Sequence, residues 1–209
     1  MLPNQTILNV LQPAFEPCPG FNDTCSEMKW NPAQGHVPRG FAGALGSIKE
    51  VSLVLVTAEP GDPYETEVYP SAPSDKVLEA SCIAALNILE RAKDLYHRNL
   101  HYLLDGCFPG LDIHEQLRRT WITDTVLCSA PKEGGKVSKS VSDECRLRYL
   151  ENQLRCFHDP FVIALGKKAE HRLKGWPGVV AAFSVAPPGC NRKEARPSWD
   201  RAIRLFHAR

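Results

Sequence analysis

The stretch VSLVLVTAEPG, residues 51–61, points to the fold of this chain. Its first eight residues are mostly apolar and rich in valine, and Glu59, Pro60 and Gly61 end the run in a turn. A short β-branched run closed by turn residues predicts a fully buried strand. Strands buried on both faces are typical of parallel sheets that helices cover on each side. We therefore expect this run to be one strand of a mostly parallel sheet.

Other strand and helix patterns alternate with this run along the chain. Short apolar runs predict three more strands, at 121–128, 159–166 and 179–185. Helical spacing of apolar residues predicts helices over 74–100, 141–157, 167–174 and 197–209, with Ser74 and Ser142 as candidate N-caps of the first two. The pattern predicts an α/β fold, a three-layer α/β/α sandwich with a central, mostly parallel four-stranded sheet.

Length and composition indicate one compact domain. The chain has 209 residues, of which 43% are hydrophobic and 23% charged, and this fits a single domain over 1–209 with an N-terminal arm at 1–46. The sequence has no apolar run of 18 residues and no signal-peptide pattern at its start. We expect a monomeric, intracellular protein of the cytoplasm with no membrane partner.

Charge is distributed unevenly along the chain. The net charge is only +1, yet residues 167–209 carry ten Lys and Arg against three acidic residues. A basic segment of this kind can contact a phosphate backbone, although a solvated helix face is the commoner explanation.

Candidate site residues follow from the expected sheet. In open parallel sheets, ligands bind beyond the carboxyl ends of the strands. The segments that follow the strands are 59–64, 124–129 and 186–192. The sequence lacks a GxSxG elbow, a Walker loop and a GxGxxG turn, which argues against an esterase or a nucleotide-binding enzyme.

Several motifs in fixed order resemble the uracil-DNA glycosylase superfamily, especially its branch with an iron–sulfur cluster. The resemblance covers roughly residues 15–206 and is strongest over 121–173. It rests on TAEPG (57–61), Asp124 with Cys128 and Pro131 after it, DECRLRYLENQL (143–154) and PFVIALGKKA (160–169). It implies a hydrolase of base excision repair that cleaves uracil, and other deaminated bases, from DNA and leaves an abasic site. Such chemistry needs no cofactor.

Two positions depart from the family pattern. Ala186 stands where relatives carry a histidine after the last strand; an alternative register places Arg196 there. Asp124 stands where relatives carry the asparagine that reads the uracil edge. These changes leave a second interpretation open, in which the chain is a catalytically weak or inactive DNA-binding scaffold on the same fold.

The resemblance implies roles for three carboxylates. Glu59 precedes Pro60, where relatives carry the residue that orients the attacking water, and Asp62 is the rival for this role. We favour Glu59 because it lies nearer the strand end. A buried Asp124 can be neutral and then both donates and accepts hydrogen bonds, as asparagine does. We expect Asp124 to read the base in this form.

Other residues are candidates for binding rather than chemistry. The aromatic rings of Phe41 and Tyr64 are candidates to stack on an extruded base. The loop after the last strand is a candidate wedge with flanks that bind phosphate. The substrate-binding set is Ala58, Pro60, Gly61, Tyr64, Phe41 and Ala186, and the DNA-binding set is Pro187, Pro188, Gly189, Asn191, Arg192 and Lys193.

Four of the eight cysteines form a separate hypothesis. Cys18 and Cys25 precede the first strand, and Cys128 and Cys145 have a spacing close to that of the cluster-bearing branch. Four thiolates suit a structural 4Fe–4S cluster, or zinc if iron is absent.

Overall fold

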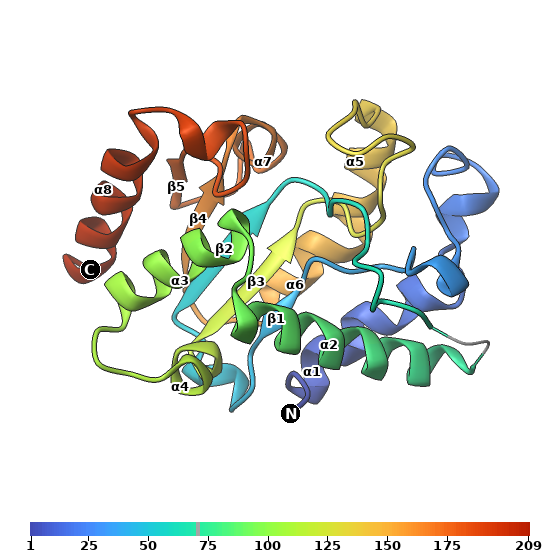
Figure 1. Ribbon diagram of the computed structural model, residues 1–209, viewed down its shortest axis with the longest axis horizontal. Coiled ribbons are helices and arrows are strands. Elements are labelled where there is room, and N and C mark those ends of the chain that lie inside the picture. Colours follow the sequence, from blue (N-terminus) through green and yellow to red (C-terminus); the bar gives the residue numbers. More distant parts are fainter. Residues whose placement is uncertain (70–71) are drawn as a thin grey trace.

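Residues 1–69 and 72–209 are described by a computed structural model, and they form an α/β fold (Figure 1). In these residues, five strands make one sheet of order β1-β3-β2-β4-β5, in which β1 is antiparallel and the others are parallel. The strands are β1 (Ala42–Gly43), β2 (Leu53–Thr57), β3 (Thr120–Asp124), β4 (Phe161–Leu165) and β5 (Val179–Ala182).

The expected number of four strands is wrong, because β1 is added beside β3. Ala42 pairs with Ile122 and Gly43 with Trp121. Two residues are too few to show the period of a strand, so no sequence pattern marks β1. The four expected strands are present and mutually parallel, with β2 between β3 and β4.

Helices flank the sheet. They are α1 (Gln5–Leu11), α2 (Ser74–Arg91), α3 (Leu95–Cys107), α4 (Ile113–Arg118), α5 (Lys139–Cys145), α6 (Glu151–Arg155), α7 (Lys167–Arg172) and α8 (Ala195–His207). Short 3₁₀ turns lie at η1 (Gln12–Phe15), η2 (Pro19–Asn22), η3 (Pro32–Gln34), η4 (Ile48–Glu50) and η6 (Gly189–Asn191), and η5 (Arg146–Leu150) is a π-helical segment.

The helix expected over 74–100 is two helices. Ala92 adopts a left-handed conformation with φ of 43°, and its N–H donates to the carbonyl groups of Ile88 and Leu89. A residue in this conformation ends a helix by satisfying its last carbonyl groups. Asp94 then caps α3, accepting a hydrogen bond from the backbone N–H of His97 at 3.0 Å.

Two expected helix caps are also wrong. Ser74 is the first residue of α2, and the capping position belongs to Pro73. The helix expected from 141 begins earlier, because Ser138 accepts a hydrogen bond from the backbone N–H of Val141 at 3.3 Å. The capping serine is therefore Ser138 and not Ser142.

The core lies on both faces of the sheet. Val54 and Val56 of β2 point to one face, which α1, the first half of α2 and the α5–α6 region cover. Leu53 and Leu55 point to the other face, under α3, α4, α8 and the end of α2. Ile7 and Leu11 of α1 are fully buried in the first core, so the N-terminal segment packs against the sheet.

Among the described residues, none of the helices has both the length and the apolar character needed to span a bilayer.

Shortening a core side chain of β2 should destabilise the protein strongly. Leu55 is 0% exposed, so Leu55→Ala leaves a cavity and should cost about 2–5 kcal/mol of unfolding free energy. Ile83→Ala on α2 is the control, because Ile83 is 47% exposed and a surface change of this kind costs less than about 0.5 kcal/mol. Urea unfolding measures both variants. Equal stability of the two would contradict the central place of β2.

Candidate functional site

The carboxyl ends of β2 and β3 bring Thr57 and Asp124 side by side. The parallel register pairs these two residues directly, and the Thr57 hydroxyl donates a hydrogen bond to Asp124 Oδ1. Asp124 is 3% exposed. The TAEPG segment and the aspartate that ends the neighbouring strand therefore meet at one edge of the sheet.

Burial controls the ionisation of Asp124. Removal from water raises the pKa of its carboxyl group from 3.8 to about 7; the Thr57 hydrogen bond opposes this shift, and the charge of Glu59 adds to it. The positive charges of Arg39 and Arg172 lower the pKa, but less than burial raises it. Near neutral pH, a large fraction of Asp124 is thus protonated and can donate a hydrogen bond.

Gly40 closes over the Asp124 carboxyl group. Its φ of +82° lies in the left-handed region, and a Cβ atom there would stand 1.9 Å from Asp124 Oδ2. A glycine is needed both for this backbone conformation and for this close approach. No local sequence pattern marks Gly40 as part of the site.

Glu59 lies beside Asp124 and is held by two cations of α7. Arg172 Nη1 stands 2.6 Å from Glu59 Oε2, and Lys168 contacts the other carboxylate oxygen. Arg172 also donates to the Ala58 carbonyl at 3.0 Å and to the Thr125 hydroxyl at 2.9 Å. The first turns after β2 and β3 are therefore fastened to α7 by one guanidinium group.

These ion pairs bear on the role predicted for Glu59. Its side chain is only 6% exposed, and each carboxylate oxygen already faces a cation. One ion pair must loosen before Glu59 accepts a proton from water. Asp62, the rival carboxylate, is exposed and pairs with Lys29 at 3.0 Å.

The GDPY loop is shaped by a buried ion pair. Arg39 Nη1 lies 3.2 Å from Glu67 Oε2, and both side chains are at least nine-tenths buried. Arg39 also contacts the Gly61 carbonyl, and Glu67 accepts from the backbone N–H of Tyr64 at 2.8 Å. Tyr64 is thus presented to solvent, 44% exposed, at the edge where the strands end.

A hydrogen-bonded cluster at the start of α3 was not expected from sequence. Asp94 Oδ2 accepts from the Tyr64 hydroxyl and lies 2.6 Å from His97 Nδ1. The Tyr96 hydroxyl lies 3.4 Å from the Thr57 hydroxyl, so the cluster reaches Asp124 through Thr57. The sequence does not reveal this cluster, because 74–100 has the pattern of one continuous helix and the break before Asp94 is not marked.

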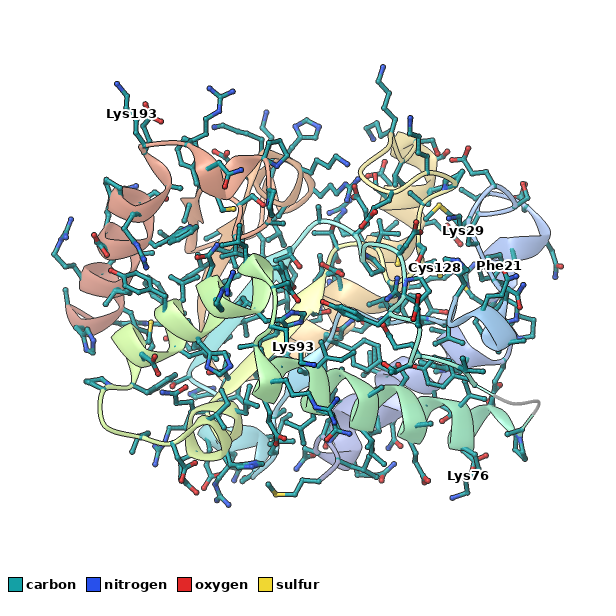
Figure 2. The ribbon with its side chains drawn as sticks, viewed as in Figure 1. Phe21, Lys29, Lys76, Lys93, Cys128 and Lys193 are labelled. Carbon is teal, nitrogen blue, oxygen red and sulfur yellow. The ribbon has the colours of Figure 1, made fainter. Side chains whose placement is uncertain are left out.

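The remaining predicted residues are spread around this edge. Phe41 is 2% exposed and packs against Trp121, with ring centroids 6.0 Å apart, so its ring lies in the core. The Ala186 N–H donates to the Ser184 hydroxyl at 3.1 Å. Beyond it the chain is exposed, and Lys193 projects away from the body of the protein (Figure 2). The exposed members of the predicted DNA-binding set are Pro187, Pro188, Asn191, Arg192 and Lys193.

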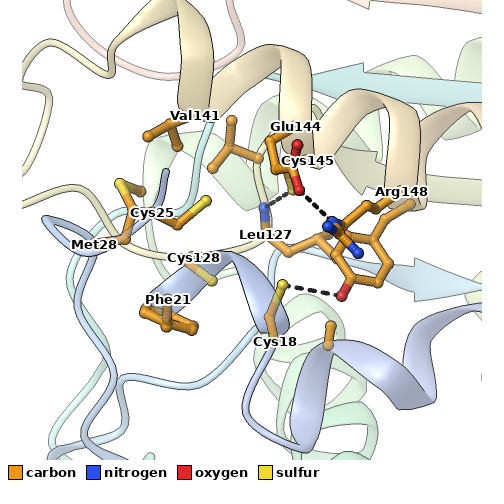
Figure 3. A pocket seen from close by; sticks show the side chains of 13 residues that line it. Cys18, Phe21, Cys25, Met28, Leu127, Cys128, Val141, Glu144, Cys145 and Arg148 are labelled. Carbon is orange, nitrogen blue, oxygen red and sulfur yellow. Dashed lines mark hydrogen bonds and ion pairs between the residues drawn. The ribbon is translucent and has the colours of Figure 1, made fainter. Parts of the chain in front are cut away.

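The four predicted cysteine ligands line one cavity (Figure 3). Cys18 Sγ accepts from the Tyr149 hydroxyl at 3.1 Å, and Cys145 Sγ accepts from the Leu127 N–H at 3.4 Å. Burial raises the pKa of Cys25 to about 11 and that of Cys145 to about 12, with the other thiols adding to the shift. At neutral pH and without a metal, Cys25 and Cys145 are therefore neutral thiols.

The four thiols of the cavity are ligands of the type that binds zinc or an iron–sulfur cluster. Among residues 1–69 and 72–209, no three His, Cys, Asp or Glu side chains are spaced to bind one metal ion. A lone zinc ion needs all its sulfur ligands about 2.3 Å from one point. An iron–sulfur cluster is bound by cysteine thiolates on separate irons, so its ligands stand further apart. Four cysteines around one mostly apolar cavity match that donor set.

Comparison of the chain with models of known protein families and with curated proteins finds no match. The likeness to uracil-DNA glycosylases therefore rests on the chain's own motifs.

The buried Asp124 should make stability depend on pH. Between about pH 4 and pH 7 the native protein keeps a proton that the unfolded chain has released, so stability falls as pH rises through this window. Asp124→Asn removes this effect. The unfolding free energy of the variant, minus that of the parent, should rise by at most about 1.4 kcal/mol per pH unit across the window. Urea unfolding at a series of pH values measures it, and a flat difference would show that Asp124 is ionised throughout.

Proposed function

We propose that this chain is a DNA glycosylase of base excision repair, which hydrolyses the N-glycosidic bond of uracil and other deaminated bases. The observation that carries the proposal is the buried carboxyl group of Asp124 at the ends of β2 and β3, with a pKa raised to about 7. A protonated carboxyl group offers one donor and one acceptor. Uracil presents an N–H beside a carbonyl group, which this pair complements.

For base excision, the protein must position the base and the attacking water and must contact the charged DNA backbone. The base is extruded from the DNA double helix and stacks on an aromatic ring, for which the exposed Tyr64 is available. Glu59, next to Asp124, accepts the proton of the attacking water once its contact with Lys168 or Arg172 loosens. The exposed 187–193 loop contacts the DNA backbone through Arg192 and Lys193.

The proposed function also implies an architecture, an oligomeric state and a place in the cell. We take the flanked sheet as a three-layer α/β/α sandwich in one domain, acting as a monomer on DNA inside the cell. The second candidate remains a DNA-binding scaffold without catalysis. The two ion pairs on Glu59 favour it, because a carboxylate held by two cations is poorly placed to take a proton from water.

The cysteine cavity is proposed to hold a 4Fe–4S cluster with a structural role. Cys18 and Cys25 belong to the N-terminal segment, whereas Cys128 follows β3 and Cys145 ends α5. A bound cluster would join these segments covalently and fix the N-terminal segment against the strand that carries Asp124.

Uracil excision tests the proposed enzyme directly. The purified protein should release uracil from a labelled oligonucleotide, detected as strand breakage after alkali. Glu59→Gln keeps the size of the side chain but removes its basicity, and should slow excision about 10²–10⁴-fold. Asp62→Asn is the matched control and should retain most activity. Equal rates for Glu59→Gln and the parent would remove Glu59 from the mechanism, and a gel shift without excision would support the scaffold.

Iron analysis tests the cluster independently of activity. Protein purified without air should be brown and contain iron and sulfide, and Cys128→Ser should lose most of both. Cys156→Ser is the control, because Cys156 lies on the same side of the sheet but does not line the cavity. If the parent is colourless and contains no iron, the four predicted ligands are core cysteines. If it contains zinc instead of iron, the metal differs but the site stands.

A further inference from the structure

Asp94 and His97 form a carboxylate–imidazole pair at the start of α3, near the Asp124 site. Hydrogen bonds from Tyr64 and from the backbone and ring of His97 outweigh the burial of Asp94 and lower its pKa to about 2. Asp94 is therefore an ionised acceptor, and the Nδ1 of His97, 2.6 Å away, carries a proton. Among the described residues, the other ring nitrogen, Nε2, has no hydrogen-bond partner within the protein.

The imidazole ring is held from three sides. Its edge packs on the Tyr96 ring with centroids 4.9 Å apart, and the Tyr64 ring lies 6.4 Å away. Only 15% of the His97 side chain is exposed. An oriented ring with one nitrogen tied to a carboxylate and the other free is the arrangement that proton transfer and hydrogen-bond donation require.

The start of α3 stands over the site. The Tyr96 hydroxyl approaches the Thr57 hydroxyl at 3.4 Å, and Thr57 donates to Asp124. Three residues further along α3, Asn99 Nδ2 donates to the Val185 carbonyl at 2.9 Å, which fixes the helix to the loop after β5. Figure 1 shows α3 beginning close to the end of β2. His97, the residue after Tyr96, therefore lies near the carboxyl end of β2.

We propose that His97 is a catalytic residue of this site, whose Nε2–H donates to the departing base, and that Asp94 is its positioning residue. The proposal rests on the glycosylase function. The bond between C1′ and the base breaks with both electrons leaving on the base, and the oxygen of water bonds to C1′. Glu59 takes one proton of that water, and the base takes a proton from the His97 imidazolium. A positioned donor matters because negative charge develops on the base in a site sheltered from water.

Single-turnover excision by the full-length chain tests this role. His97→Ala should lower the rate about 10²-fold or more. The affinity for uracil-containing DNA should stay unchanged, and added imidazole should restore part of the rate. His114→Ala is the matched control, since it removes another carboxylate-paired histidine, 3.2 Å from Glu90, outside the site. It should excise like the parent.

Asp94→Asn separates positioning from folding. Asparagine caps a helix as well as aspartate does, so the variant should still fold. Its unfolding temperature should fall, because the charged acceptor of Tyr64 and His97 is lost, and the excision rate should fall with it. If the parent excises uracil and His97→Ala excises it equally fast, the catalytic role of His97 is overturned while the glycosylase function stands. Loss of activity in His97→Ala that imidazole does not restore, together with weakened DNA binding, would make His97 a structural residue. A parent without uracil excision would overturn the glycosylase function and this role with it.

Discussion

The parallel register of β2 and β3 is the constraint on which the site depends. It pairs Thr57 with Asp124 at the last position of both strands, with helices over both faces of the sheet. A carboxyl group placed there is shielded from bulk water, and Gly40 packs closely against its second oxygen. Its protonation follows from this burial, because an isolated charge in such a place costs more than binding a proton.

The two neighbouring acids Glu59 and Asp124 differ in the partners of their carboxyl groups. Glu59 is compensated by Arg172 and Lys168. Within the part of the chain that the structure describes, the Asp124 carboxyl group has one hydrogen-bond partner, the Thr57 hydroxyl. The nearest cations lower its pKa less than burial raises it. Two acids whose surroundings separate their charge states can divide the work of donating and accepting protons. The Asp94–His97 pair adds a third group, oriented by a short hydrogen bond.

Much of the fold could be predicted because β2 and β4 are continuous apolar runs, and such runs are typical of buried parallel strands. The missed features depend on contacts between distant parts of the chain. The strand β1 is two residues long and exists only through pairing with β3. Ala92 ends α2 without a glycine or proline to mark the break. Arg39 enters the site through a buried pair with Glu67, 28 positions away, which no local pattern reveals.

The protonation state of Asp124 underlies the proposed reading of the base, and it can be observed without any substrate. Carbon-13 NMR of aspartate-labelled protein, with Asp124→Asn used to assign the signal, follows this carboxyl group as the pH is raised. The account predicts a midpoint near pH 7, about three units above that of an exposed aspartate. A midpoint below about pH 5 would mean that Asp124 is ionised at neutral pH, and the proposed donor to the base would not exist.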